Sequence, residues 1–173
     1  MVKRVLMVIA PEGFRDEEYQ KPHDEFRKAG FEIVTASSVQ GEAMGMLGGT
    51  AVAEETIDEL HGTDFDAVVF IGGGGAKVFF DDADAHRIAS EAAASGKVVA
   101  AICIAPAILA NAGVLRGKKA TSFNDQSIIG IMKSKGAVHT GADVERDGKI
   151  ITSSGPAAAA KFGQEIVKAL RMP

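Results

Sequence analysis

The chain has 173 residues, of which 46% are hydrophobic and 24% are charged, a size and balance typical of one soluble domain with a substantial core over residues 1–173. Its 19 basic and 23 acidic residues give a formal net charge of −4, and the scattered basic residues argue against a nucleic-acid partner. The apolar runs are too short for a membrane span or a signal peptide, and a single cysteine indicates a reducing, cytoplasmic setting.

Strand and helix patterns alternate along the whole chain. Short apolar runs predict buried strands at 5–10, 31–36, 66–71 and 97–102. Amphipathic segments that end at glycines predict helices at 16–29, 83–95 and 104–112. Further along, the pattern predicts a strand at 119–121, a helix at 127–133, a hairpin of strands 143–146 and 149–152, and a last helix opened by Gly155 and Pro156. This order predicts an α/β fold with one doubly wound, mainly parallel sheet flanked by helices.

Three loops should meet at the carboxyl edge of that sheet, where folds of this class bind their ligands. They are residues 11–16 after the first strand, the four glycines 72–75 after the third, and Cys103. Their convergence predicts a single site.

Cys103 lies between the strand 97–102 and the helix that follows. A side chain on such a tight turn points outward beside the unpaired N–H groups that open the helix, a position that favours a thiolate. Ala101 and Ala105 are small enough for a strained turn, and Pro106 suits a first helical turn. A lone cysteine is more often a small buried hydrophobic residue. The turn pattern favours the nucleophile, and the buried alternative stays open.

The glycines 72–75 do not form a nucleotide-binding loop. Position 77 is Lys77, where a dinucleotide fingerprint needs glycine, and the Walker spacing is absent. We expect the N–H of Gly73 to pair with that of Ile104 as an oxyanion hole for a ligand on the thiol. A simple tight turn is the alternative.

Glu18 is the candidate acid or base. It lies one turn into the helix 16–29 and four residues before Pro22, so we expect it to turn inward while Glu17 faces solvent. Glu12, Asp16 and Glu17 have the simpler role of acids near a helix N-terminus. The four histidines lie outside the three loops and are expected on exposed or helical surfaces: His23, His61, His86 and His139. Their spacing gives no metal site, and no cofactor is expected.

Several segments together resemble the PfpI/ThiJ superfamily, which includes the Parkinsonism-associated deglycase. They are residues 100–106, the strand 66–73, Glu18 ahead of Pro22, and residues 147–156. The likeness spans essentially the whole chain and implies a flavodoxin-like fold. It further implies Cys103 as the reactive thiol, Glu18 as its protonated or proton-sharing partner, and Gly73 and Ile104 as backbone donors. It also implies a homodimer or a larger homo-oligomer.

The chain departs from this family at the expected base. Ile104 stands where PfpI-type members carry a histidine, and Phe123 stands where deglycase-type members bring one. Lys77 replaces the acidic residue that PfpI oligomers contribute from the glycine loop, and Ser154 lies where an arginine commonly precedes Gly-Pro. The scaffold and the thiol remain, while the usual base is missing.

Three function classes remain open. The resemblance implies a glutathione-independent glyoxalase or deglycase for small 2-oxoaldehydes, in which Cys103 adds to the aldehyde and Glu18 moves the proton. The same thiol could instead serve as an oxidative-stress sensor. A PfpI-type cysteine peptidase ranks third, because no histidine is placed to pair with the cysteine. Enzyme and sensor share every site residue, so the sequence does not separate them.

Overall fold

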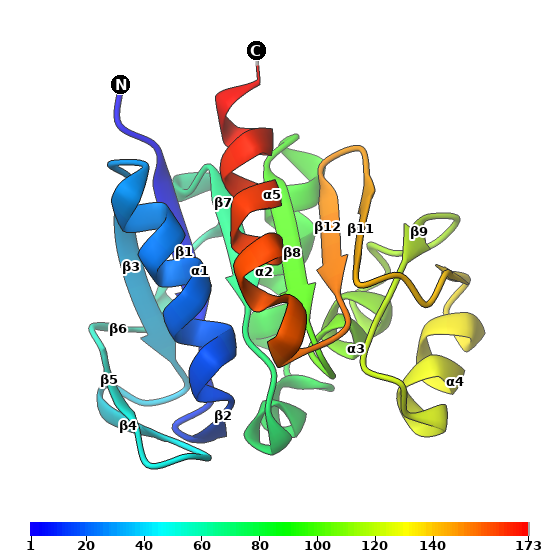
Figure 1. Ribbon diagram of the computed structural model, residues 1–173, viewed down its shortest axis with the longest axis horizontal. Helices are drawn as coiled ribbons and strands as arrows, with labels where there is room; N and C mark the ends of the chain where they lie inside the picture. The colour runs from blue at the N-terminus through cyan, green and yellow to red at the C-terminus, as the bar shows by residue number, and fades with distance from the viewer. Residues whose placement is uncertain (173) are drawn as a thin grey trace.

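The computed structural model describes residues 1–172 and is built around a seven-stranded sheet of order β11-β12-β8-β7-β1-β3-β6 (Figure 1). All neighbouring strands pair in parallel except β11, which runs antiparallel to β12 at one edge. The predicted mainly parallel sheet is therefore confirmed. Its strands are β1 (Arg4–Val8), β3 (Glu32–Ser37), β6 (Glu55–Thr56), β7 (Ala67–Phe70), β8 (Val98–Ile102), β11 (Val144–Asp147) and β12 (Ile150–Ser153).

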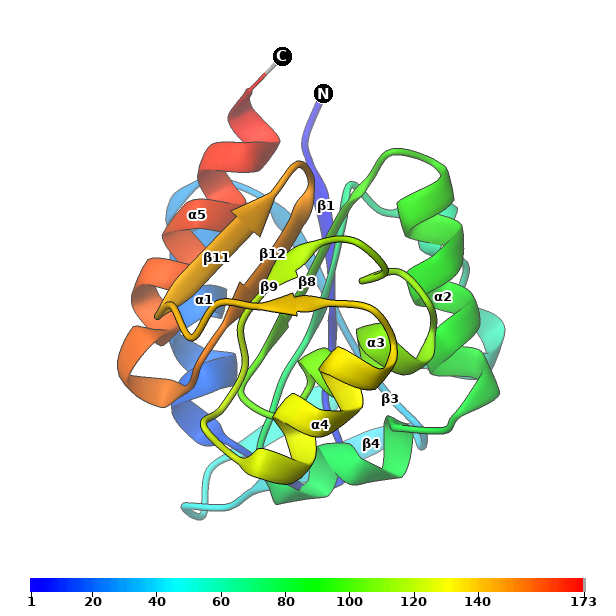
Figure 2. The ribbon, with the colours of Figure 1, turned by 90° about the vertical axis from the view of Figure 1, so that its right-hand side faces the viewer.

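Helices cover both faces of the sheet, as the predicted doubly wound fold requires. The helices α1 (Asp16–Lys28) and α5 (Ala159–Arg171) pack together on one face, and α2 (Ala83–Ala94) and α3 (Pro106–Asn111) cover the other (Figures 1 and 2). The last helix buries Phe162, Ile166 and Leu170, the three residues that its sequence pattern turns inward.

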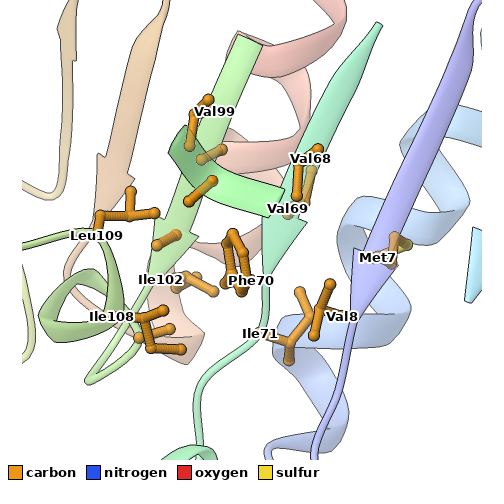
Figure 3. Packing of buried hydrophobic residues seen from close by; sticks show 14 of the residues in the cluster. Met7, Val8, Val68, Val69, Phe70, Ile71, Val99, Ile102, Ile108 and Leu109 are labelled. Carbon is orange, nitrogen blue, oxygen red and sulfur yellow. The ribbon is translucent and has the colours of Figure 1, made fainter. Parts of the chain in front are cut away.

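The core lies between the central strands and these helices. Strands β1, β7 and β8 are almost fully buried, because both faces of a parallel sheet are covered. Figure 3 shows Phe70 of β7 beside Ile102 of β8 at the ends of their strands, with Ile108 of α3 close by. This packing fixes the carboxyl ends of β7 and β8, from which the glycine loop and Cys103 emerge.

Two smaller sheets lie outside the central one. The glycine-rich segment after β3 forms a hairpin of β4 (Gly41–Gly45) and β5 (Thr50–Ala53), which joins β2 (Glu12–Phe14) in a three-stranded sheet. On the β11 side of the molecule, β9 (Lys119–Ala120) pairs with β10 (Val138–His139), and α4 (Gln126–Ser134) connects them (Figure 1). Residues 1–172 also contain four 3₁₀ turns: η1 (Ile57–Glu59), η2 (Gly62–Asp64), η3 (Gly74–Phe79) and η4 (Pro156–Ala158).

The differences from the predicted elements are local. The helix expected at 104–112 begins only at Pro106, because the chain first turns through Ile104 and Ala105. The two-residue strand β10 was not predicted, since so short a run carries no periodic signal. The predicted hairpin at residues 143–152 is confirmed, with Gly148 at a φ of +63° in its turn. No helix within residues 1–172 has the length and apolar character needed to cross a membrane.

Candidate active site

Cys103 occupies a strained position directly after β8. Its φ is +65°, and it is the only non-glycine residue with positive φ among residues 1–172. This left-handed conformation costs an L-residue roughly 1–2 kcal/mol. Neighbouring strands and loops hold it in place: the Cys103 N–H donates to Ser153 O (2.9 Å), and Phe123 N–H donates to Cys103 O (2.8 Å). The strained turn predicted from the alanine-flanked sequence is therefore confirmed.

The Cys103 side chain lines a cavity of about 250 Å³ and is itself 8% exposed. All three predicted loops reach this cavity, and the β4–β5 hairpin and the start of α4 close it from other sides. The other lining residues are Arg15, Glu18, Met46, Gly73, Gly74, Lys77, Ile104, Phe123, Asp125, Ser127, Ile128 and Pro156. The structure thus brings all four predicted site residues into one cavity.

The glycine loop allows these groups to approach one another. A Cβ atom at Gly72 would lie 2.5 Å from Glu18 Oε1 and 2.6 Å from Cys103 Cβ, so no side chain fits between them. Gly73 has a φ of +98°, and a Cβ there would lie 2.5 Å from the carbonyl oxygen of Gly13. Bare backbone at positions 72 and 73 is needed to bring the thiol, the carboxyl and the first loop together.

Glu18 is fully buried, and neither of its carboxyl oxygens has a hydrogen-bond partner among residues 1–172. Because burial disfavours the charged form, it raises the pKa of Glu18 to about 7. Its neighbour Glu17 is partly exposed and pairs with Arg15 at 3.1 Å. The predicted inward turn of Glu18 is confirmed, and its carboxyl is poised to gain or lose a proton near neutral pH.

The thiol and the carboxyl influence each other's titration. Burial, and after it the negative charge of Glu18, raise the pKa of Cys103 to about 12, while the backbone N–H groups of Gly73 and Ile104 act in the opposite direction. The expectation that the turn favours a thiolate is therefore wrong, because burial and, after it, the Glu18 charge outweigh the two N–H donors. The two groups form a coupled pair, in which the thiol keeps its proton while Glu18 is ionised.

The sequence did not predict the roles of two residues at the site, Arg15 and Asp16. Arg15 lines the cavity from the residue before α1, and its guanidinium donates to Glu17. Asp16 does more than favour the helix N-terminus, because its carboxylate accepts hydrogen bonds from Leu47 N–H (3.0 Å) and Gly49 N–H (2.7 Å). Asp16 thereby holds the hairpin tip that carries Met46 to the cavity. The available signal was a pair of charged residues, Arg15 and Asp16, at the start of the helix that follows the first predicted loop.

The histidines do not supply the missing base. None of the four lines the cavity. His23 and His86 lie on helices and His61 is exposed, as expected, but His139 is a half-buried residue of β10. Its Nε2 lies 3.0 Å from Ser122 Oγ, next to Phe123 in the chain. Phe123 itself lines the cavity where relatives were expected to place a histidine.

The model of the DJ-1/PfpI family matches residues 3–169, and the chain belongs to this family. A deglycase of Thermococcus kodakarensis is 33% identical over 96% of this chain and 99% of its own length. Protein/nucleic acid deglycase 2 of Escherichia coli is 34% identical over 98% of this chain and 99% of its own. An uncharacterized protein of Methanocaldococcus jannaschii is 39% identical over 96% of this chain and 82% of its own.

Solved structures agree with this assignment. A ThiJ/PfpI domain protein from Brachyspira murdochii superimposes with a TM-score of 0.93 at 30% identity, covering 98% of this chain and 96% of the other. Drosophila melanogaster DJ-1beta gives a TM-score of 0.88 at 28% identity, covering 98% and 91%. The resemblance to the PfpI/ThiJ superfamily is confirmed, and the family contains enzymes.

Proposed function

We propose that this protein is a cysteine-dependent, glutathione-independent glyoxalase or deglycase that acts on small 2-oxoaldehydes. The observation that carries the proposal is the pairing of Cys103 with Glu18 in one cavity, where the N–H groups of Gly73 and Ile104 lie beside the thiol. Relatives at 33–34% identity that are named deglycases support the same chemistry.

The first step is addition of the thiol to the aldehyde. The ionised Glu18 takes the proton of Cys103 as the sulfur bonds to the aldehyde carbon, which removes the need for a free thiolate beforehand. The N–H groups of Gly73 and Ile104 stabilise the oxyanion that forms. Glu18 then returns the proton to that oxygen, which gives a hemithioacetal. A pKa of about 7 suits this exchange, because the carboxyl can accept and release a proton with similar ease.

The second step isomerises the hemithioacetal and releases the product. Glu18 removes the hydrogen of the former aldehyde carbon as a proton, and the hydroxyl proton of the adduct passes to the adjacent carbonyl oxygen in the resulting enediol. Glu18 then delivers its proton to the carbon that bears this new hydroxyl, and the former aldehyde carbon becomes the carbonyl of a 2-hydroxyacyl thioester. Water then cleaves the thioester and regenerates the thiol. The net reaction adds one water molecule to a 2-oxoaldehyde and yields a 2-hydroxy acid, with no oxidant, metal or thiol cosubstrate.

Deglycation begins by forming the same bond, between the Cys103 sulfur and the former aldehyde carbon. On an aminocarbinol, the early adduct of a 2-oxoaldehyde with an amine, the Cys103 sulfur displaces the amine nitrogen from carbon, and Glu18 transfers the thiol proton to the leaving amine. The resulting hemithioacetal continues as above. Both activities therefore depend on the same two side chains.

We assign every proton transfer in this scheme to Glu18, because no histidine lines the cavity and Asp125 accepts hydrogen bonds from Ser127. Loss of a positioned acid or base costs on the order of 10²- to 10⁴-fold in rate. We therefore expect slower turnover than in relatives that keep a histidine.

The sensor alternative has less support than the enzyme. Oxidation begins from a thiolate, and burial together with the Glu18 charge raises the pKa of Cys103 to about 12. A sensor would gain two oxygen atoms on Cys103 under mild peroxide before any methionine is oxidised, which intact-mass and peptide analysis would detect. A cysteine peptidase would need a histidine paired with Cys103, and no histidine lines the cavity.

Assembly and location complete the proposal. We place the protein in the cytoplasm, where its single thiol stays reduced. We also expect a homodimer or a larger homo-oligomer, as the family resemblance implies. Light scattering of the purified protein would test the assembly.

The proposed function is tested by measuring turnover without added glutathione or metal. Purified protein, free of glutathione and metal, should consume methylglyoxal and release lactate, and Cys103→Ser should abolish the reaction while circular dichroism shows an intact fold. Equal rates for wild type and Cys103→Ser would show that the protein does not catalyse conversion of methylglyoxal through Cys103.

A further inference from the structure

Two cations flank the backbone donor that faces the thiol. Arg15 is tied to the glycine loop, because its own N–H donates to Gly72 O at 2.9 Å. Lys77 belongs to η3, the turn that begins directly after Gly73. Both residues line the same cavity as Cys103. Arg15 and Lys77 therefore reach the cavity of the reacting sulfur from the two segments that meet at Gly73.

Both cations keep hydrogen-bond donors free for a ligand. Arg15 uses Nε and Nη2 for Glu17, which leaves Nη1 without a hydrogen-bond partner among residues 1–172. Within the same residues, Lys77 Nζ makes no hydrogen bond and no ion pair, although its charge, after the hydrogen bonds from Ser127, helps to lower the pKa of the Asp125 carboxyl. A guanidinium and an ammonium with free N–H groups are strong partners for a carboxylate.

Two acids, Glu18 and Asp125, line the cavity with these cations. The hydrogen bonds from Ser127 and, after them, the charge of Lys77 lower the pKa of Asp125. Glu18 is buried beside the thiol and shares its proton, as argued above. Asp125 is turned to its own helix, since its Oδ1 accepts from the N–H (2.8 Å) and the hydroxyl (2.6 Å) of Ser127. Neither acid forms an ion pair with Arg15 or Lys77 among residues 1–172, so both cations can still meet a carboxylate.

We infer that this cavity selects small 2-oxoaldehydes that carry a carboxylate at the end remote from the aldehyde. This narrows the proposed function and rests on it. The aldehyde carbon meets Cys103, and the carboxylate lies between Arg15 and Lys77. The reaction is unchanged, so water adds to the 2-oxoaldehyde and the product is a 2-hydroxy dicarboxylate. A cavity of about 250 Å³ has room for a molecule of this size.

Alkylation of the thiol tests the charge preference without turnover. Iodoacetate and iodoacetamide are similar in size and differ in charge, and the intact mass reports on Cys103 alone because the chain has one cysteine. We expect the ratio of the iodoacetate rate to the iodoacetamide rate to exceed the ratio for free glutathione by about ten-fold at low salt. Lys77→Gln and Arg15→Gln should each lower the ratio toward that of glutathione.

The matched control is Lys28→Gln, which removes the same charge at the opposite end of α1. It should leave the ratio unchanged. A wild-type ratio at or below that of glutathione, or a ratio that the cavity variants do not alter, overturns the inference.

A second test compares the turnover of a charged and an uncharged substrate. 4,5-Dioxopentanoate should react with a kcat/KM about ten-fold above that of its uncharged amide, and Lys77→Gln should narrow this ratio. Equal turnover of both compounds, with no alkylation preference, would support the proposed function and overturn this inference. An alkylation preference without turnover of any 2-oxoaldehyde would leave the anion selectivity standing and contradict the proposed function.

Discussion

Glu18 Oε1 and Cys103 Cβ lie together over Gly72, each within about 2.6 Å of the point where a side chain would begin at that residue. This closeness decides the chemistry of the thiol. A charged carboxylate at that place opposes a thiolate, whereas the same carboxylate can receive the thiol proton during attack. The reactivity of Cys103 therefore belongs to the pair and not to the cysteine alone.

Replacement of Glu18 by glutamine should lower the pKa of the Cys103 thiol. Glutamine keeps the shape of the side chain and removes the negative charge, so the thiolate costs less to form. The rate of alkylation by iodoacetamide at pH 8 should rise by roughly ten-fold. Glu17→Gln is the matched control, because it removes the same charge from a partly exposed neighbour. An unchanged pH profile in Glu18→Gln would show that the pair is not coupled.

The buried carboxyl should also make folding stability depend on pH. The pKa of Glu18 is raised from 4.5 to about 7 in the folded protein, so the folded state holds the proton more tightly than the unfolded chain. This contribution is fully present below about pH 4.5 and is lost as the pH rises through about 7, a change on the order of 3 kcal/mol. Urea unfolding at pH 5 and pH 8 should show the loss in wild type. Glu18→Gln should lack this loss, so that its change in stability differs from that of wild type by about this amount even though His23 and His139, whose pKa values are lowered by burial, titrate in both proteins. A change with pH equal to that of wild type would contradict this role.

The left-handed backbone at residue 103 predicts an order of stability for two small substitutions. Cys103→Gly relieves the positive φ, while Cys103→Ala keeps it. We expect the glycine variant to be more stable than the alanine variant by about 1 kcal/mol, even though glycine has the larger entropy in the unfolded chain. Chemical denaturation measures the difference. If alanine were the more stable of the two, the turn would not be strained.

A histidine placed in the cavity should accelerate the proposed reaction if proton transfer limits it. Phe123 lines the cavity, is 45% exposed, and donates its N–H to the Cys103 carbonyl, so Phe123→His adds an imidazole without burying it. The rate of lactate formation from methylglyoxal should rise by roughly ten-fold or more. Phe123→Asn serves as a polar control that cannot titrate. Equal rates in the two variants would mean that the absent histidine is not what limits turnover.

Much of this site can be predicted from the local sequence. The apolar strand before Cys103, the alanines around it and Pro106 are enough to predict the turn and its strain, because backbone constraints act over a few residues. The inward direction of Glu18 follows from helix periodicity. The parallel order of the central strands follows from the alternation of strands with helices.

The remainder depends on contacts between distant segments. Asp16 binds N–H groups more than thirty residues ahead in the chain, and no local pattern marks which hairpin tip it holds. Arg15 acquires its place through the backbone of Gly72. The high pKa of Cys103 arises from burial and from Glu18, a residue on another element, so the turn that locates the thiol does not reveal its protonation.

The most direct test of the account is a double-mutant cycle on lactate formation from methylglyoxal. Cys103→Ser and Glu18→Gln should each reduce kcat/KM by at least about 10²-fold, and the double variant should be no slower than the slower single variant, because the two residues act as one unit. Glu18→Ala should behave like Glu18→Gln. A wild-type rate no greater than that of Cys103→Ser, or losses that multiply in the double variant, would contradict the claim that Glu18 and Cys103 form a single catalytic pair.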